Sequence, residues 1–196
     1  MPIMPDKWII EMAAKFKMIE PFEKSLVGNC LISYGVSSYG YDFRVSREFK
    51  IADGAGEAGE FDPKNPSPET FADFAGDICL IPPRGFVIAR SLEYFRIPRD
   101  VLAICLGKST YTRNGLLINF APFEPEWEGH VTFGVFNSLP LPVRLYAGEG
   151  IAQVLFLKAD SVCETSYSDR KGKYQSSKGI SLSRVMRENE QNRSGK

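Results

Sequence analysis

Short apolar runs interrupted by glycine and proline restrict most strongly what this chain can fold into. Tyr41, Phe43 and Val45 alternate with polar residues, which is typical of a strand with one buried face. Further strands are predicted in the stretches 77–98, 101–107, 115–121, 130–137, 143–150 and 151–159. Many short strands joined by such turns predict a mainly β fold, as a sandwich, a jelly roll or a distorted barrel.

The ends of the chain differ from this pattern. Residues 6–17 are predicted to form a short helix capped by Asp6, and residues 53–70, rich in Gly, Asp, Pro and Glu, are predicted to form a surface loop. We expect a single β domain over residues 1–165. The polar stretch 166–196 contains Tyr, Lys and Gly, and it is predicted to be a lid that orders over a ligand, followed by a polar tail.

Composition limits the classes of partner. Lys plus Arg and Asp plus Glu each number 24 in the 196 residues, so a nucleic acid is not expected as the main partner. No apolar run is long enough to cross a membrane, and the N-terminal stretch does not resemble a signal peptide, so we expect a cytoplasmic protein. The four scattered cysteines are expected to be reduced thiols. The chain lacks the H-x-E and P-C-x-x-C framework of zinc nucleobase deaminases, so no zinc is expected.

The segment Gly107–Leu116, GKSTYTRNGL, carries the most informative chemistry. A single helical turn starting near Lys108 would direct free backbone N–H groups outward and place Ser109 and Arg113 on one face. Backbone donors, a hydroxyl and two cations together suit a phosphate group. A capped surface turn without a ligand is the alternative.

Several motifs follow one another along the chain: SSYGYDFR at 37–44, EYFRIP at 93–98, GKSTYTRNG at 107–115, FEPEWEG at 123–129, FN at 136–137, AGEGIAQ at 147–153 and ETSYSDRKGKYQ at 164–175. In this order and spacing they resemble the dCTP deaminases, which are relatives of the trimeric dUTPases. The resemblance extends from about Asp6 to about Arg184.

The resemblance implies a homotrimer of distorted β-barrel or jelly-roll subunits of the dUTPase type, with active sites between subunits. It implies that the substrate is a deoxynucleoside triphosphate, with dCTP as the favoured one. It also implies that Mg²⁺ is held by the triphosphate rather than by protein side chains. Position 134, Ser109 and Arg113 correspond to catalytic positions. The residues implied in substrate binding are Lys108, Ser109, Thr110 and Arg113 for the triphosphate and base pocket, Glu124 for the sugar, and Tyr167, Lys173, Tyr174 and Ser177 in the lid.

This sequence departs from the family at the position implied to be catalytic. The family has a glutamate there, which takes a proton from the attacking water, protonates the ring, and later protonates the departing amine with the second proton of that water. Here the position is Gly134, which has no group that can transfer a proton. Phe136, two residues further along the strand, faces the same side and is predicted to lean into the space left by the glycine.

Two other differences reduce polar side chains around the base, since Ala121 and Ser177 stand where relatives commonly have threonine and glutamine. The phosphate-side residues match the family. Three functions therefore stay open: deamination of dCTP to dUTP and ammonia, a nucleoside triphosphate diphosphohydrolase, and a nucleotide-binding trimer without catalysis. Glu124, Glu126 and Glu128 are the carboxylates considered as replacements for the missing glutamate.

Overall fold

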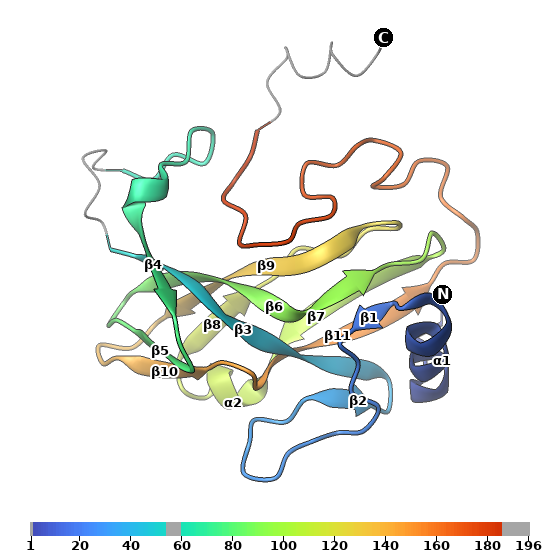
Figure 1. Cartoon of the computed structure of the whole chain (residues 1–196), viewed down its shortest axis with the longest axis horizontal. Helices are drawn as coiled ribbons and strands as arrows, with labels where there is room; N and C mark the ends of the chain where they lie inside the picture. The colour runs from blue at the N-terminus through green and yellow to red at the C-terminus, as the bar shows by residue number, and fades with distance from the viewer. Residues whose placement is uncertain (1, 54–59, 186–196) are drawn as a thin grey trace.

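Two long strands, β3 (Gly40–Ala52) and β6 (Phe86–Arg96), pair at the centre of an antiparallel sheet in the computed structural model, which describes residues 2–53 and 60–185 (Figure 1). The hydrogen-bonded order of the main path is β7-β11-β3-β6-β9-β8. The other strands on this path are β7 (Val101–Gly107), β8 (Leu116–Asn119), β9 (Glu128–Asn137) and β11 (Gly150–Lys158).

Short strands extend this sheet at its margins. β1 (Ile19–Glu20) pairs with β6, while β2 (Gly35–Ser37) and β4 (Phe71–Ala75) pair with β3. β5 (Ile78–Ile81) and β10 (Val143–Tyr146) form a separate two-stranded sheet. All these pairings are antiparallel, so the prediction of a mainly β fold is confirmed.

The sheet curls until its two end strands approach each other. A Cβ atom at Gly107 of β7 would lie 3.3 Å from Cβ of Ile118 on β8. The result is a nearly closed barrel, whose interior is filled by aromatic and branched side chains. Phe43 and Phe95, both fully buried, meet edge to face there with ring centroids 5.6 Å apart.

Alternation along β9 decides which side chains face this core. Val131, Phe133 and Val135 are buried inside the barrel. His130, Thr132 and Gly134 are on the outward face and only partly buried. Strand periodicity predicts this division, because successive side chains point to opposite faces of a sheet.

The N-terminal helix α1 (Asp6–Phe16) packs Ile9 and Ala13 against the barrel. Its predicted cap is wrong: Pro5 is the N-cap residue, and Asp6 is the first helical residue, whose carboxylate accepts the Lys7 amide at 2.7 Å. Proline as the N-cap leaves no side chain that could cap the helix. Phe16, the last residue of the helix, is 62% exposed.

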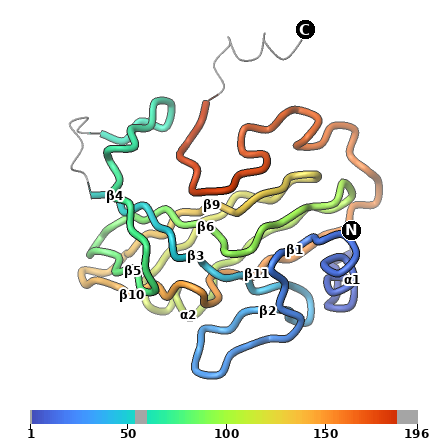
Figure 2. Tube along the Cα trace, in the orientation of Figure 1, coloured from blue at the N-terminus to red at the C-terminus, as the bar shows by residue number. Residues whose placement is uncertain are grey.

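Two regions are predicted to lie outside the strands: the loop 53–70 and the C-terminal stretch 166–196. The predicted loop 53–70 includes residues 54–59, which are outside the described residues, and ends in the 3₁₀ turn η1 (Pro68–Thr70). The C-terminal chain leaves β11 and folds back over β9, as the orange and red trace shows in Figure 2. We refer to residues 163–185 as the closing segment; residues 186–196 of the predicted tail are outside the described residues.

Candidate functional site

A cavity of about 450 Å³ lies between the outward face of β9, the turn that precedes it, and the closing segment. Five residues that were singled out from the sequence line it: Glu124, Tyr167, Lys173, Tyr174 and Ser177. Ala121 also lines it. Residues about fifty positions apart in the chain thus form one cavity, because the closing segment returns to β9.

Backbone hydrogen bonds hold the closing segment along β9. The Ser176 amide donates to the Glu128 carbonyl at 2.9 Å, and the His130 amide donates to the Ser177 carbonyl at 2.9 Å. The Ser181 amide donates to the Thr132 hydroxyl at 3.2 Å. These bonds add a strand-like edge to β9 and fix the wall of the cavity that carries Ser177.

The two tyrosines of the closing segment lock to each other and to the barrel. The Tyr174 amide donates to the Tyr167 hydroxyl at 3.0 Å. The Trp127 indole N–H donates to the Tyr174 carbonyl at 3.2 Å. Burial is the main cause that raises the pKa of the Tyr167 phenol, so this hydroxyl stays protonated at neutral pH.

The charged side chains of Arg170 and Lys173 in the closing segment already have partners in the structure. The Glu124 carboxylate pairs with the Arg170 guanidinium, which also lies over the Tyr167 ring. The Lys173 ammonium donates to the Arg184 carbonyl. Both contacts use partly exposed groups, so a bound ligand could exchange with them at modest cost.

His130, which was not singled out as a site residue from the sequence, also lines the cavity. Its Nδ1 lies 3.1 Å from the Glu93 carbonyl, and its ring meets Tyr94 edge to face with centroids 5.3 Å apart. Burial, followed by the nearby Arg90 charge, lowers the pKa of the imidazole. Its position on the outward face of β9, two residues before Thr132, is the signal that could have identified it.

Gly134 follows Thr132 on the same face of β9, at the level of Asn119 on β8. The ring of Phe86 occupies the space beside it: a Cβ atom at position 134 would lie 2.7 Å from Cε2 and 2.9 Å from Cζ of that ring. The prediction that Phe136 fills this space is therefore wrong. Phe136 pairs directly with Phe86 across β6 and β9, so Phe86 is the diagonal neighbour that reaches Gly134.

The other two candidate carboxylates are engaged elsewhere. Glu126 accepts Nη1 of Arg99 at 2.6 Å, and Glu128 accepts the Ser176 hydroxyl at 2.8 Å. Neither carboxylate lines the cavity, whereas Glu124 does.

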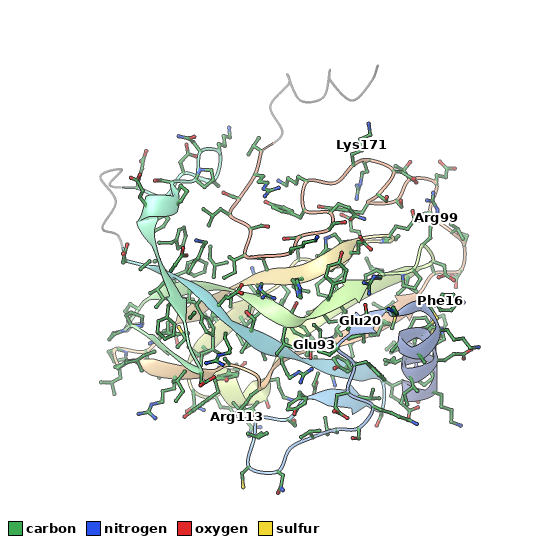
Figure 3. All side chains as sticks on the ribbon, viewed as in Figure 1. Phe16, Glu20, Glu93, Arg99, Arg113 and Lys171 are labelled. Atoms are coloured by element: carbon green, nitrogen blue, oxygen red, sulfur yellow. The ribbon has the colours of Figure 1, made fainter. Side chains whose placement is uncertain are left out.

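The predicted phosphate residues form a separate cluster around α2 (Ser109–Thr112). The predicted helical turn is present, since the Arg113 amide donates to the Ser109 carbonyl at 2.9 Å. Ser109, Thr110 and Arg113 are exposed, and Thr110 borders a second cavity of about 570 Å³. Figure 3 shows Arg113 on the opposite side of the barrel from the closing segment.

Lys108 is oriented inward in the structure. Its Nζ lies 2.6 Å from Asp42 Oδ2, 2.7 Å from the Ser33 carbonyl and 2.8 Å from the Ser33 hydroxyl. Both members of the Lys108–Asp42 pair are largely buried. Its predicted contact with triphosphate stays a prediction, and it would require this pair to open.

A single chain therefore does not bring the phosphate cluster to the closing segment. The predicted phosphate residues lie at α2 and the predicted lid residues lie over β9, with the barrel between them (Figure 1). Within residues 2–53 and 60–185, no group of three or more His, Cys, Asp or Glu side chains could hold a metal ion. The four cysteines, all in the described part, are free thiols, and no helix described is long and apolar enough to span a membrane.

Comparison with known proteins gives a consistent result. A family described as dCTP deaminase-like matches residues 3–159. A dCTP deaminase of Wolinella succinogenes is 57% identical over 187 residues, covering 95% of this chain and 100% of that protein. One of Paramagnetospirillum magneticum is 59% identical over 185 residues, covering 94% of this chain and 100% of that protein.

One solved structure shares the fold. The crystal structure of 2'-deoxycytidine 5'-triphosphate deaminase from Agrobacterium tumefaciens matches with a TM-score of 0.58 at 16% identity. The match covers 79% of this chain and 47% of that chain, so this chain spans about half of that protein's length.

Proposed function

The chain belongs to the dCTP deaminase-like family, and on this premise we propose that it binds dCTP and deaminates it hydrolytically to dUTP and ammonia, without zinc and at a rate lowered by Gly134. The observation that most supports this proposal is the cavity under the closing segment. It collects Glu124, Tyr167, Lys173, Tyr174 and Ser177, the positions where the family motifs put sugar and lid contacts.

The cavity suits a nucleoside in size and lining. A volume of about 450 Å³ falls within the usual range for small-molecule sites. Phe123 and Trp127 supply apolar surface, while Glu124 and Ser177 supply hydrogen-bonding groups at its edges. A carboxylate can accept hydrogen bonds from sugar hydroxyls, and the Ser177 hydroxyl can bind a polar edge of the base.

The triphosphate is assigned to the α2 cluster of a neighbouring subunit. Ser109, Thr110 and Arg113 offer two hydroxyls and a guanidinium on an exposed turn, a donor set suited to phosphate oxygens. Because the barrel separates this cluster from the cavity in one chain, a complete site needs a second copy. This geometry supports sites between subunits, and the family resemblance favours a homotrimer as the assembly that forms them. Mg²⁺ bound to the triphosphate would neutralise part of its charge.

The reaction adds water across the C4=N3 bond of cytosine, so that one proton of the water moves to the ring nitrogen N3. The proton of the new 4-hydroxyl then moves to the 4-amino group, which leaves as ammonia while the C4=O bond forms. Gly134 can move none of these protons. Glu124 is the carboxylate that lines the cavity, where it pairs with Arg170. We therefore propose slow turnover with Glu124 or water as a weak proton carrier.

A second candidate function is nucleotide binding without turnover. The observation that favours it is the Phe86 ring beside Gly134, which occupies the space where a side chain at this position would begin.

Free thiols at all four cysteines support the proposal that the protein works in the cytoplasm.

One incubation with dCTP and Mg²⁺ separates these functions. Ammonia and dUTP in equal amounts support deamination, and pyrophosphate release would identify a diphosphohydrolase instead. Saturable dCTP binding without either product would support the non-catalytic function. Absence of dCTP binding would reject the proposal as a whole.

Mixing of variant subunits tests the shared site. Arg113→Ala and Lys173→Ala each should weaken dCTP binding as homotrimers. Co-refolded mixtures should recover a fraction of normal sites, because some sites then combine two unaltered surfaces. A mixture that binds no better than either variant alone would place both residues in one subunit's site.

A further inference from the structure

We propose that Arg99, which does not line the cavity, positions the closing segment so that Tyr167, Tyr174 and Ser177 face the nucleotide. This inference deepens the proposed function and rests on it, since positioning matters for affinity only if the cavity holds a nucleotide. Arg99 lies in the turn between β6 and β7, beside the start of the closing segment (Figure 3).

One guanidinium joins the barrel to the closing segment. Nη1 of Arg99 donates to Glu126 at 2.6 Å, in the turn that precedes β9. Nη2 donates to the Asp169 carboxylate at 2.7 Å and to the Glu164 carbonyl at 3.1 Å. The same side chain therefore holds the cavity's turn and both ends of the first loop of the closing segment.

Asp169, which is bound by Arg99, also forms two hydrogen bonds with Ser166. The Ser166 amide donates to the Asp169 carboxylate at 3.0 Å, and the Asp169 amide donates back to the Ser166 hydroxyl at 3.1 Å. Ser166 is only 1% exposed. This reciprocal pair, closed by Arg99, fixes the backbone conformation on either side of Tyr167.

Tyr167 connects this pair to the rest of the cavity wall through hydrogen bonds. Its amide donates to the Pro125 carbonyl at 3.0 Å, and its hydroxyl accepts the Tyr174 amide. Three residues beyond Tyr174, Ser177 bonds to β9 through its carbonyl. A continuous series of contacts thus runs from Arg99 to the residues that line the cavity.

The chemistry of arginine suits this role. A planar guanidinium offers several donors in a fixed arrangement, whereas a lysine ammonium is a single flexible point charge. The Arg99 and Asp169 side chains are 35% and 43% exposed, so solvent screens their attraction. The benefit of Arg99 is therefore geometric: it reduces the number of conformations that the closing segment must give up on binding a ligand.

The distribution of contacts separates positioning from general stability. Apart from Glu126, every partner of Arg99 given above belongs to the closing segment. Loss of Arg99 should therefore release that segment while the barrel strands keep their own hydrogen bonds.

The test compares Arg99→Ala, Arg99→Lys and Asp169→Asn with Lys158→Ala. Lys158 is a matched control because its ammonium pairs with Asp100, next to Arg99, at 3.2 Å rather than with a residue of the closing segment. Two measurements are made on each full-length protein: hydrogen exchange of backbone amides, and the Kd for dCTP with Mg²⁺ by calorimetry.

We expect Arg99→Ala to speed exchange at Tyr174, Ser176 and His130, whose amides bond across the closing segment, while amides of β3 and β6 keep their protection. The Kd for dCTP should rise at least tenfold. Asp169→Asn should have a similar effect, Arg99→Lys should fail to restore affinity, and Lys158→Ala should stay within twofold of the unaltered chain.

An Arg99→Ala protein that binds dCTP within twofold of the unaltered chain would overturn the inference, and so would equal loss of protection in β3 and β6. If the unaltered chain itself binds no dCTP, the proposed function fails instead. The exchange data would then still show whether Arg99 holds the closing segment.

Discussion

The Phe86 ring on β6 lies against Gly134 on β9, with its Cε2 atom 2.7 Å from where a Cβ atom at position 134 would be. The two residues are diagonal neighbours on the outward face of paired strands, since Phe86 stands opposite Phe136 and Ile88 opposite Gly134. An aromatic ring beside a glycine covers backbone that would otherwise be exposed. Any side chain at position 134 must therefore displace this ring.

We predict that Gly134→Glu raises dCTP deamination at least tenfold, about 1.4 kcal/mol of barrier, because it supplies the missing proton carrier. Phe86 is 38% exposed and can swing toward solvent, but the crowding should cost about 1–3 kcal/mol of folding stability. Phe86→Leu in the same chain should recover part of that stability. Ammonia release and urea unfolding measure the two effects.

The control for this prediction is Gly134→Gln, which has the same shape without a titratable group. It should show the stability cost and no gain in rate. Equal rates for the Glu and Gln variants would mean that proton transfer at position 134 does not limit the reaction.

We predict that Arg113→Ala raises the Kd for dCTP at least tenfold. Hydrogen bonds to charged groups contribute about 1.5–3 kcal/mol, and a guanidinium can make two to a phosphate. Arg47→Ala is the control, because Arg47 is exposed and pairs with Asp77 on the barrel surface. Calorimetry that finds Arg113→Ala within twofold of the control would remove Arg113 from the phosphate site.

His130 should make folding stability depend on pH. Its pKa in the folded chain is lowered by burial, whereas the unfolded chain has an ordinary value of about 6.5. As pH falls below that value, the unfolded chain takes up a proton before the folded chain does, so stability falls as pH decreases and rises as pH increases. The loss levels off below the folded-state pKa.

Urea unfolding between pH 5 and 8 tests this dependence, with His130→Asn as the comparison. The variant should show a weaker rise in stability with pH across that window. Because His130 is the single histidine of the chain, its NMR titration can be assigned directly. A folded-state pKa above 6.5 would contradict the prediction.

The buried ion pair of Arg44 and Glu93 should be a large stability determinant. Arg44 Nε donates to Glu93 at 2.7 Å, and the Glu93 carboxylate is completely buried. Arg44→Ala leaves that carboxylate without its cation and should cost about 3–5 kcal/mol, as measured by chemical unfolding. Arg47→Ala, at an exposed pair, should cost less than about 1 kcal/mol. Similar losses for both variants would show that burial adds nothing to the Arg44 pair.

Local features of this protein follow directly from the order of its residues. Alternation along residues 130–137 predicts both the strand and the outward face that carries Gly134, because side-chain direction in a strand depends only on position. The turn around Ser109 and Arg113 is also local, because its hydrogen bonds join residues three or four positions apart, and it could therefore be predicted. The motifs at 123–129 and 164–175 identified Glu124, Tyr167 and Tyr174, which the structure brings into one cavity.

Contacts between residues far apart in the chain depend on how the strands pair and pack into the barrel. Phe86 rather than Phe136 covers Gly134, because diagonal neighbours depend on which strands pair and in what register, and the periodicity of β9 alone does not identify β6 as its partner. For the same reason the sequence did not reveal that Lys108 is bound to Asp42, or that Arg99 joins the turn before β9 to the closing segment. Each of these contacts links residues between about 27 and 70 positions apart, and only the packed barrel brings them within hydrogen-bonding distance.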